Sequence, residues 1–297
     1  MTLTKDLAAP PNEKPLELPT RTRPARALLG WMQRDEAIKA QAGQRADIQL
    51  PEYEERASRA RMAVAARPTG IDQTSVICDA PQELQEHIEA LRQAPAAAQY
   101  FQQGWRVCVA DLRTVCALQP TVFTDQAVER TRGVTADDLR SIAAVSLPTP
   151  VTSQLPSLFD QAKQSWILSS GNANLRIVGN WSAQVQPGMA GFGFIVSVLP
   201  SFVQVASVSN RYVLRDGYHR AYGFLRAGIT TVPVLTREFG PFEDLGLPPG
   251  LLPPAAYLGE RPPLLTDFLN DEVSAEVVLP AVQKTIVIPG LELTTLG

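Results

Sequence analysis

The chain has 297 residues, of which 45% are hydrophobic and 19% are charged, and its formal net charge is −3. This length and composition suit a globular protein with one large domain or two smaller ones, and the slightly acidic balance argues against a dedicated nucleic-acid coat protein. No apolar run reaches the roughly 18 residues of a membrane span, and the first residues lack the apolar core of a signal peptide, so we expect a cytoplasmic protein.

The numbers and spacing of the cysteines and histidines limit the metal sites that can be expected. There are three cysteines and two histidines without a CxxC pair, so no structural zinc site is expected. Cys108 and Cys116 are expected to be small buried hydrophobic residues, and His87, which lies among glutamates, is expected at a solvated or core-edge position. Arginine, which suits bidentate phosphate contacts, outnumbers lysine by 22 to 5, although a GC-rich coding sequence gives the same bias.

The N-terminal third is predicted to be mostly helical. Residues 1–30 are rich in Pro, Thr and charge, which indicates a flexible arm. Residues 31–103 are predicted to form a helical region in which Pro51 starts one helix and Asp79 caps another. A further short helix is expected to end at Gly104.

The next segment is predicted to be a strand, because residues 105–112 alternate between apolar and polar side chains and are rich in β-branched residues. Thr124 and Thr135 are each expected to cap a helix.

An insertion is expected near residues 146–190. Its first part is Pro-rich and is predicted to be a loop, and residues 157–170 are predicted to be a helix. Gly179-Asn180 is expected to be the turn of a hairpin. The glycine-rich run 188–194 lacks the lysine and the helix of a phosphate loop, so we interpret it as a turn leading into a strand. Two strands joined by a turn at Ser209-Asn210 follow.

The region 240–297 is again Pro-rich and ends with two predicted strands, 275–280 and 284–289. We expect this extension either to wrap around the main domain or to join the sheet edge of a partner.

The segment from Tyr212 to Leu235 has the pattern of a strand, a sharp turn, a helix and a second strand. The turn falls at Asp216-Gly217, the helix begins near Tyr218, and Gly228 is a typical helix stop. The free N–H groups and the dipole at such a helix start favour an anion.

Each residue of this turn has a possible role and a structural alternative. Gly217 allows close backbone approach, and Arg220 can contact phosphate oxygens or pair with an acid. His219 can transfer a proton or be a structural histidine. Asp216 can hold a metal ion, activate a hydroxyl or cap the helix. Tyr218 can stack on a base or pack against the insertion.

The segment resembles the ParB/sulfiredoxin-like superfamily, whose stand-alone members often read close to DGHHR, followed after about eight residues by Gly and a VPV-like strand. Here DGYHR spans residues 216–220, and Gly228 and the sequence Val232-Pro233-Val234 follow. The resemblance is strong over about 30 residues and loose over 105–145. It implies an α+β fold with a ParB/sulfiredoxin-like domain at 104–239, between a helical N-terminal region and a Pro-rich C-terminal extension.

In this family the motif holds nucleotide phosphates. The resemblance therefore implies a bound nucleoside triphosphate, ATP or CTP, with Mg²⁺, but no metal site made of protein ligands alone. It implies catalytic roles for His219 and Asp216. The residues expected to bind phosphate or nucleotide are Gly217, Tyr218, His219, Arg220, Gln119 and Asp111.

The sequence departs from three groups of relatives. Sulfiredoxins have a catalytic cysteine where this chain has Tyr218, so sulfinic-acid reduction is not expected. Partition proteins have Glu-Arg-Arg after the glycine and a helix-turn-helix after the domain, and here only Arg220 matches. The free-serine kinases have a closer motif and a separate catalytic acid, for which Asp111 and Glu129 are candidates.

Three hypotheses follow. The first is a phosphotransferase or NTPase that binds a nucleotide or a phosphorylated small molecule. The second is a nucleic-acid-associated module of the partition or nuclease type, which the charge does not favour. The third is a non-catalytic scaffold with an idle pocket, whose extensions bind a protein partner or form a homodimer.

Overall fold

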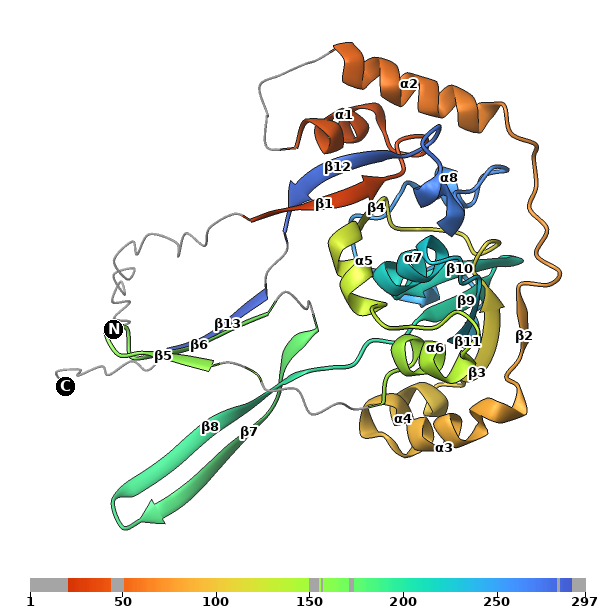
Figure 1. Ribbon diagram of the computed structural model, residues 1–297. Coiled ribbons are helices and arrows are strands. Elements are labelled where there is room, and N and C mark those ends of the chain that lie inside the picture. The colour runs from red at the N-terminus through yellow and green to blue at the C-terminus, as the bar shows by residue number, and fades with distance from the viewer. Residues whose placement is uncertain are drawn as a thin grey trace, which may run out of the picture.

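The computed structural model describes residues 21–43, 51–149, 155, 157–170, 174–281 and 284–289. Within these residues the protein is mixed α+β, as predicted, with several small sheets (Figure 1). The rest of the predicted arm and the last eight residues lie outside the described part. No helix in the described ranges is long and apolar enough to cross a membrane.

A five-stranded sheet in the order β10-β9-β11-β3-β2 forms the centre of the largest unit. Strands β9 and β11 are parallel, and the other neighbours are antiparallel. The predicted strand at 105–112 is confirmed, and so is the turn at Ser209-Asn210, where both residues have positive φ. The strands are β2 Ile77–Asp79, β3 Arg106–Asp111, β9 Gln204–Val208, β10 Arg211–Asp216 and β11 Thr231–Glu238.

Helices lie beside this sheet, and the three predicted caps are wrong. Thr124 is the first residue of its helix, and its side chain makes no capping hydrogen bond. Asp79 belongs to β2, and the helical turn there starts only after Pro81. The cap expected at Thr135 is supplied by Asp138, whose Oδ1 accepts from the N–H groups of Arg140 and Ser141 at 3.0 and 3.2 Å. The helical elements are η1 Gln82–Leu84, α3 Gln85–Gln93, α4 Pro95–Gln102, α5 Thr124–Arg130, α6 Leu139–Ser146 and α7 Tyr218–Arg226.

A second sheet, in the order β12-β1-β4, corrects the prediction of a flexible arm. Strand β1 (Thr22–Ala27) pairs over its whole length with β12 (Ala275–Pro280) and also pairs with β4 (Thr121–Phe123). The proline and charged residues of β1 gave no strand signal in the sequence, and its partner β12 is far away along the chain. The helices α1 (Arg34–Ala42) and α2 (Pro51–Ala65) pack together, and α1 also packs against β12.

The middle of the chain forms hairpins, so the helix predicted at 157–170 is wrong. Asp160 accepts two N–H bonds from the turn that joins β5 to β6, which favours a tight connection. The turn predicted at Gly179-Asn180 is also wrong, because β7 continues through it with a bulge, and the hairpin turns at Pro187-Gly188. The strands are β5 Ser157–Asp160, β6 Ser165–Ser170, β7 Leu175–Gln186 and β8 Met189–Val198.

The C-terminal extension wraps around the same chain, which is the first of the two predicted alternatives. Both of its predicted strands are present, and β13 (Lys284–Pro289) pairs with β6. Arg67 donates two hydrogen bonds, of 3.0 and 2.7 Å, to the carboxylate of the buried Asp267, and so ties the extension to the segment after α2. The remaining helical elements are η2 Phe242–Leu245, α8 Pro254–Tyr257 and η3 Leu265–Leu269.

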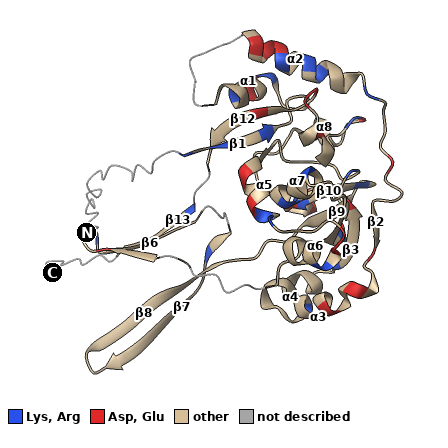
Figure 2. Ribbon diagram, in the orientation of Figure 1, with Lys and Arg blue, Asp and Glu red and all other residues tan. Residues whose placement is uncertain are grey.

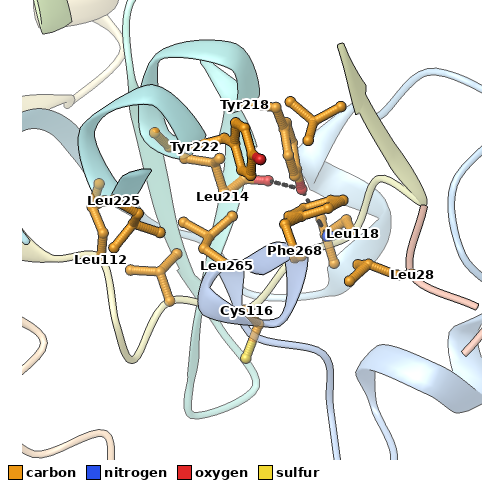
Figure 3. Close-up of a cluster of buried hydrophobic side chains, with 14 of the residues drawn as sticks. Leu28, Leu112, Cys116, Leu118, Leu214, Tyr218, Tyr222, Leu225, Leu265 and Phe268 are labelled. Atoms are coloured by element: carbon orange, nitrogen blue, oxygen red, sulfur yellow. Dashed lines mark hydrogen bonds between the residues drawn. The ribbon is translucent and has the colours of Figure 1, made fainter. Parts of the chain in front are cut away.

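The main hydrophobic core combines residues from the N-terminal, central and C-terminal parts of the described chain, but none from strands β5 to β8. Figure 3 shows Leu28 and Leu118 close to Tyr218 of α7 and to Phe268 of η3. Cys116 belongs to the same cluster, and both Cys108 and Cys116 are fully buried, as predicted. The helix that starts at Tyr218 is therefore fixed from several sides.

Candidate functional site

The strand, turn and helix predicted around Asp216 are all present. Strand β10 ends at Asp216, Gly217 adopts a φ of 95°, and α7 begins at Tyr218. A Cβ on Gly217 would lie 2.8 Å from the Cα of Val203, so both the conformation and the close approach require glycine. Gly228 follows the helix with a φ of 77°.

Arg220 is buried, with only 4% of its surface exposed. Its Nη1 donates to the carbonyl oxygens of Val145 and Ser146 at 3.1 and 3.4 Å, and its Nη2 donates to the Ser201 hydroxyl at 2.5 Å. The carbonyls belong to the end of α6, where a cation is favourable. The buried Nε has no hydrogen-bond partner. Burial lowers the pKa of Arg220 to about 10, which leaves it charged at neutral pH.

Arg220 and Arg130 line the same cavity, which has a volume of about 590 Å³. Arg130 is the last residue of α5, and burial lowers its pKa below the usual arginine value. Among the described residues, no carboxylate lies within ion-pair distance of either guanidinium. The other lining residues are Pro95, Ala96, Ala144, Val145, Pro148, Thr149, Ser197, Val198, Leu199, Pro200 and Ser201.

Asp216 lines a smaller adjoining cavity of about 130 Å³, together with Gln99 and Tyr100. The two cavities share four lining residues, which include Ser201. The carboxylate accepts a 2.7 Å hydrogen bond from the N–H of Gly217. Burial raises the pKa of Asp216, and nearby Arg220 partly offsets that effect.

His219 occupies a packed position and is not among the residues that line these two cavities. Its ring stacks on Phe123 with the centroids 5.9 Å apart and the planes 3° apart, and its buried Nε2 has no partner. Burial lowers the pKa of His219 to about 3, and the charges of Arg130 and Arg220 act in the same direction. The ring is therefore neutral at pH 7, and its predicted role in proton transfer stays a prediction.

The pH dependence of stability tests this position. The folded-state pKa of His219 lies below the 6.5 of an ordinary histidine. As the pH falls below this value, the unfolded chain therefore takes up a proton that the folded protein excludes. The free energy of unfolding therefore falls by up to about 1.4 kcal/mol for each pH unit of acidification in this range. We expect the variant His219→Leu to lose less stability than the unmodified protein between about pH 6.5 and about pH 4.5 in urea unfolding. Asp216 titrates in both proteins and cancels in the comparison, so equal losses would contradict a neutral His219.

Tyr218, predicted to contact the ligand, is fully buried and has a structural role. Its hydroxyl accepts a hydrogen bond from the N–H of Leu118 at 2.7 Å and donates to the carbonyl of Leu214 at 2.7 Å (Figure 3). It also accepts a 3.2 Å hydrogen bond from the N–H of Gln119. This arrangement corrects the idea that Tyr218 stacks on a base. Gln119 therefore contacts the hydroxyl of Tyr218 through its backbone N–H.

The two candidate acids upstream of the motif, Asp111 and Glu129, are not among the residues that line the cavity of Arg130 and Arg220. Asp111 pairs with Thr231, just after the C-terminal end of α7, whereas Asp216 precedes its N-terminal end. Asp111 also forms a 2.6 Å ion pair with Arg113. Glu129 is exposed on α5. Arg130 and Ser201 were not predicted from the sequence, because an arginine in the last turn of a helix is typical of dipole compensation alone.

The described residues hold no cluster of three or more His, Cys, Asp or Glu side chains suited to a metal ion. Asp216 is the single predicted acid that lies on a cavity adjoining Arg220. Comparison of the chain with protein-family models, with curated proteins and with solved structures gives no match.

Proposed function

We propose that the protein binds a nucleotide or another phosphorylated small molecule in the cavity lined by Arg130 and Arg220. The observation that carries the proposal is the pair of partly or fully buried guanidinium groups with no carboxylate within ion-pair distance among the described residues. Asp216 is close enough to interact with both, but it offers one negative charge for two positive charges. Buried cations are expensive unless they are paired, and an anionic ligand would supply the missing charge.

Two further features support a phosphorylated ligand. The cavity is lined by Arg220, which lies in the first turn of α7, and the positive end of the dipole of this helix favours an anion nearby. Its volume of about 590 Å³ falls within the usual range for small-molecule sites. The wall contains prolines and aliphatic side chains, which suit the less polar part of a nucleotide.

Asp216 offers a route from binding to phosphoryl transfer. A hydroxyl bound in the adjoining cavity would attack the terminal phosphorus, the bond to the leaving phosphate oxygen would break, and Asp216 would accept the hydroxyl proton. Its raised pKa suits a proton acceptor. Mg²⁺ would arrive with the nucleotide, and Asp216 is the side chain we assign to contact it.

Binding is tested by calorimetry with ATP, CTP, GTP and UTP, each with Mg²⁺, and with inorganic pyrophosphate. Replacing Arg130 by glutamine is expected to weaken binding about 10- to 100-fold, because a charge-assisted hydrogen bond contributes about 1.5–3 kcal/mol. Arg130 makes no hydrogen bond within the described structure, so the variant should stay folded.

Arg113→Gln is the matched control, because Arg113 is exposed and pairs with Asp111 away from the cavity. Its affinity should equal that of the unmodified protein. Absence of heat with every ligand, or equal affinities for the Arg130 and Arg113 variants, would reject the proposal. A gel shift with DNA or RNA that disappears at high salt would favour the nucleic-acid hypothesis instead.

A further inference from the structure

A second cavity lies between the β7–β8 hairpin and the three-stranded sheet β13-β6-β5. It has a volume of about 590 Å³, and it shares no lining residue with the cavity of Arg130 and Arg220. Figure 1 shows the hairpin and this sheet on the same side of the molecule, away from the central sheet. We call it the aromatic cavity, because five of its 13 lining residues are Phe159, Trp166, Trp181, Phe192 and Phe194.

One face of the sheet forms the first wall of the aromatic cavity. Directly paired residues on neighbouring strands point to the same face of a sheet. Phe159 pairs with Trp166, and Trp166 pairs with Ile288, so these three side chains lie side by side across the sheet. The rings of Phe159 and Trp166 contact each other, with their centroids 5.0 Å apart and their planes at 49°. Strand pairing therefore builds this wall without the help of a ligand.

The hairpin forms the second wall. Phe192, Phe194 and Val196 alternate along β8, so they share one of its faces, and all three line the cavity. Trp181 also lines the cavity, although it pairs with Gly193 on the other face. Its indole lies across Gly193, where an added Cβ would be 2.5 Å from the indole Nε1. The glycine therefore leaves room for this ring to extend over β8.

The aromatic side chains of this cavity are available to a ligand. Their exposed fractions range from 40% to 79%, so none of them belongs to a buried core. Exposed apolar surface is unfavourable in water, and its concentration at one place indicates a binding site. Small-molecule sites usually measure about 300–1,000 Å³ and combine apolar and aromatic walls with a few polar groups, and the aromatic cavity has these properties.

The composition of the walls indicates a ligand without charge. None of the lining residues is charged, and Figure 2 shows most of the β7–β8 ribbon in tan, the colour of residues other than Lys, Arg, Asp and Glu. An ionised ligand would lose hydration in this cavity without gaining an ion-pair partner from its walls. A sugar would need more hydrogen-bonding side chains than the hydroxyl of Ser157 and the amide of Gln164.

The many rings indicate that the ligand is itself aromatic, because aromatic rings gain energy beyond surface burial when they stack or meet edge to face. Gln164 can orient such a ligand. Its Nε2 donates to the carbonyl of Gln161 at 2.8 Å, and its amide oxygen is an acceptor for a ligand hydroxyl.

We propose that the aromatic cavity binds a neutral aromatic small molecule, with its ring against Trp166 and the rings of β8 and with a polar group near Gln164. This site is separate from the arginine cavity, so either assignment can fail while the other holds.

Fluorescence titration with N-phenyl-1-naphthylamine, a neutral aromatic dye, tests the proposal. We expect saturable binding of one dye molecule per chain with a micromolar Kd. The neutral compound 4-tert-butylphenol should displace the dye. The cation (4-hydroxyphenyl)trimethylammonium has the same shape, and it should need a concentration at least about 10-fold higher. Absence of saturable dye binding, or displacement by the cation at an equal or lower concentration, would overturn the proposal.

The site is located with a pair of variants. Trp166→Ala is expected to weaken dye binding about 10-fold, because it removes a ring that contacts the ligand. Val185→Ala is the matched control, since Val185 is 61% exposed on the same hairpin and does not line the cavity, and its affinity should equal that of the unmodified protein. Equal affinities of the two variants would count against the aromatic cavity.

Photolabelling of the unmodified protein keeps the test valid if Trp166→Ala folds poorly. Benzophenone is a neutral aromatic molecule that attaches covalently to neighbouring C–H groups when irradiated. Peptide mass spectrometry should find the label on β5, β6 or β8, and 4-tert-butylphenol should reduce this labelling. Labelling that occurs only outside these strands would show that the ligand binds elsewhere and would overturn the proposal.

Discussion

Replacing Gly217 by alanine is expected to destabilise the folded protein by about 2–5 kcal/mol. About 1–2 kcal/mol comes from forcing an L-residue into a left-handed conformation, and about 1–3 kcal/mol comes from overpacking. The second part is expected because the new Cβ would lie 2.8 Å from the Cα and 3.0 Å from Cγ2 of Val203. Urea unfolding followed by tryptophan fluorescence measures the change.

Gly228→Ala separates the two contributions. Gly228 has a φ of 77°, but a Cβ added to it would meet no described atom within 4 Å, so only the conformational part, about 1–2 kcal/mol, is expected. Equal destabilisation in the two variants would show that the approach of Val203 to the turn is unimportant. A larger loss for Gly217 would support a turn held tightly in place beside Asp216.

Replacing Tyr218 by phenylalanine is expected to cost about 2–4 kcal/mol of stability, because buried groups without partners cost about 1–3 kcal/mol each. Removing the hydroxyl deprives the N–H groups of Leu118 and Gln119 and the carbonyl of Leu214 of a shared partner. Urea unfolding at neutral pH measures the loss.

Tyr222→Phe is the matched control on the same helix. Tyr222 is also buried, but its hydroxyl makes no hydrogen bond within the described residues, so a change below about 1 kcal/mol is expected. If the two substitutions had equal effects, the hydrogen bonds of Tyr218 would not explain why a tyrosine follows the glycine here.

The local motif was predictable from the sequence because its signals are local. Gly217 and Gly228 mark positions that need positive φ, and the flanking alternation predicts strands. Strand β1 was missed because pairing with β12 joins residues about 250 positions apart, as in the pair Ala25 and Val277. The helix expected at 157–170 was wrong because the turn after Asp160 selects a hairpin.

The candidate site was predictable only in part. An arginine in the first turn of a helix indicates an anion site, but the sequence does not reveal that Arg220 also binds the last carbonyls of α6. Arg130 joins the cavity because α5 packs against α7, a tertiary contact without a sequence signature. His219 looked catalytic by residue type, and the stacking on Phe123 that buries it is equally non-local.

The shared core has a consequence for biosynthesis. Leu28, Leu118 and Phe268 belong to one hydrophobic cluster, and Val277 of β12 completes it. Strand β4 is available to β1 early in synthesis, but a ribosome must deliver about nine-tenths of the polypeptide before β1 meets β12, the neighbour with which it pairs over its whole length. With such high contact order, we expect slow folding and a prolonged dependence on chaperones, which shield the waiting apolar segments.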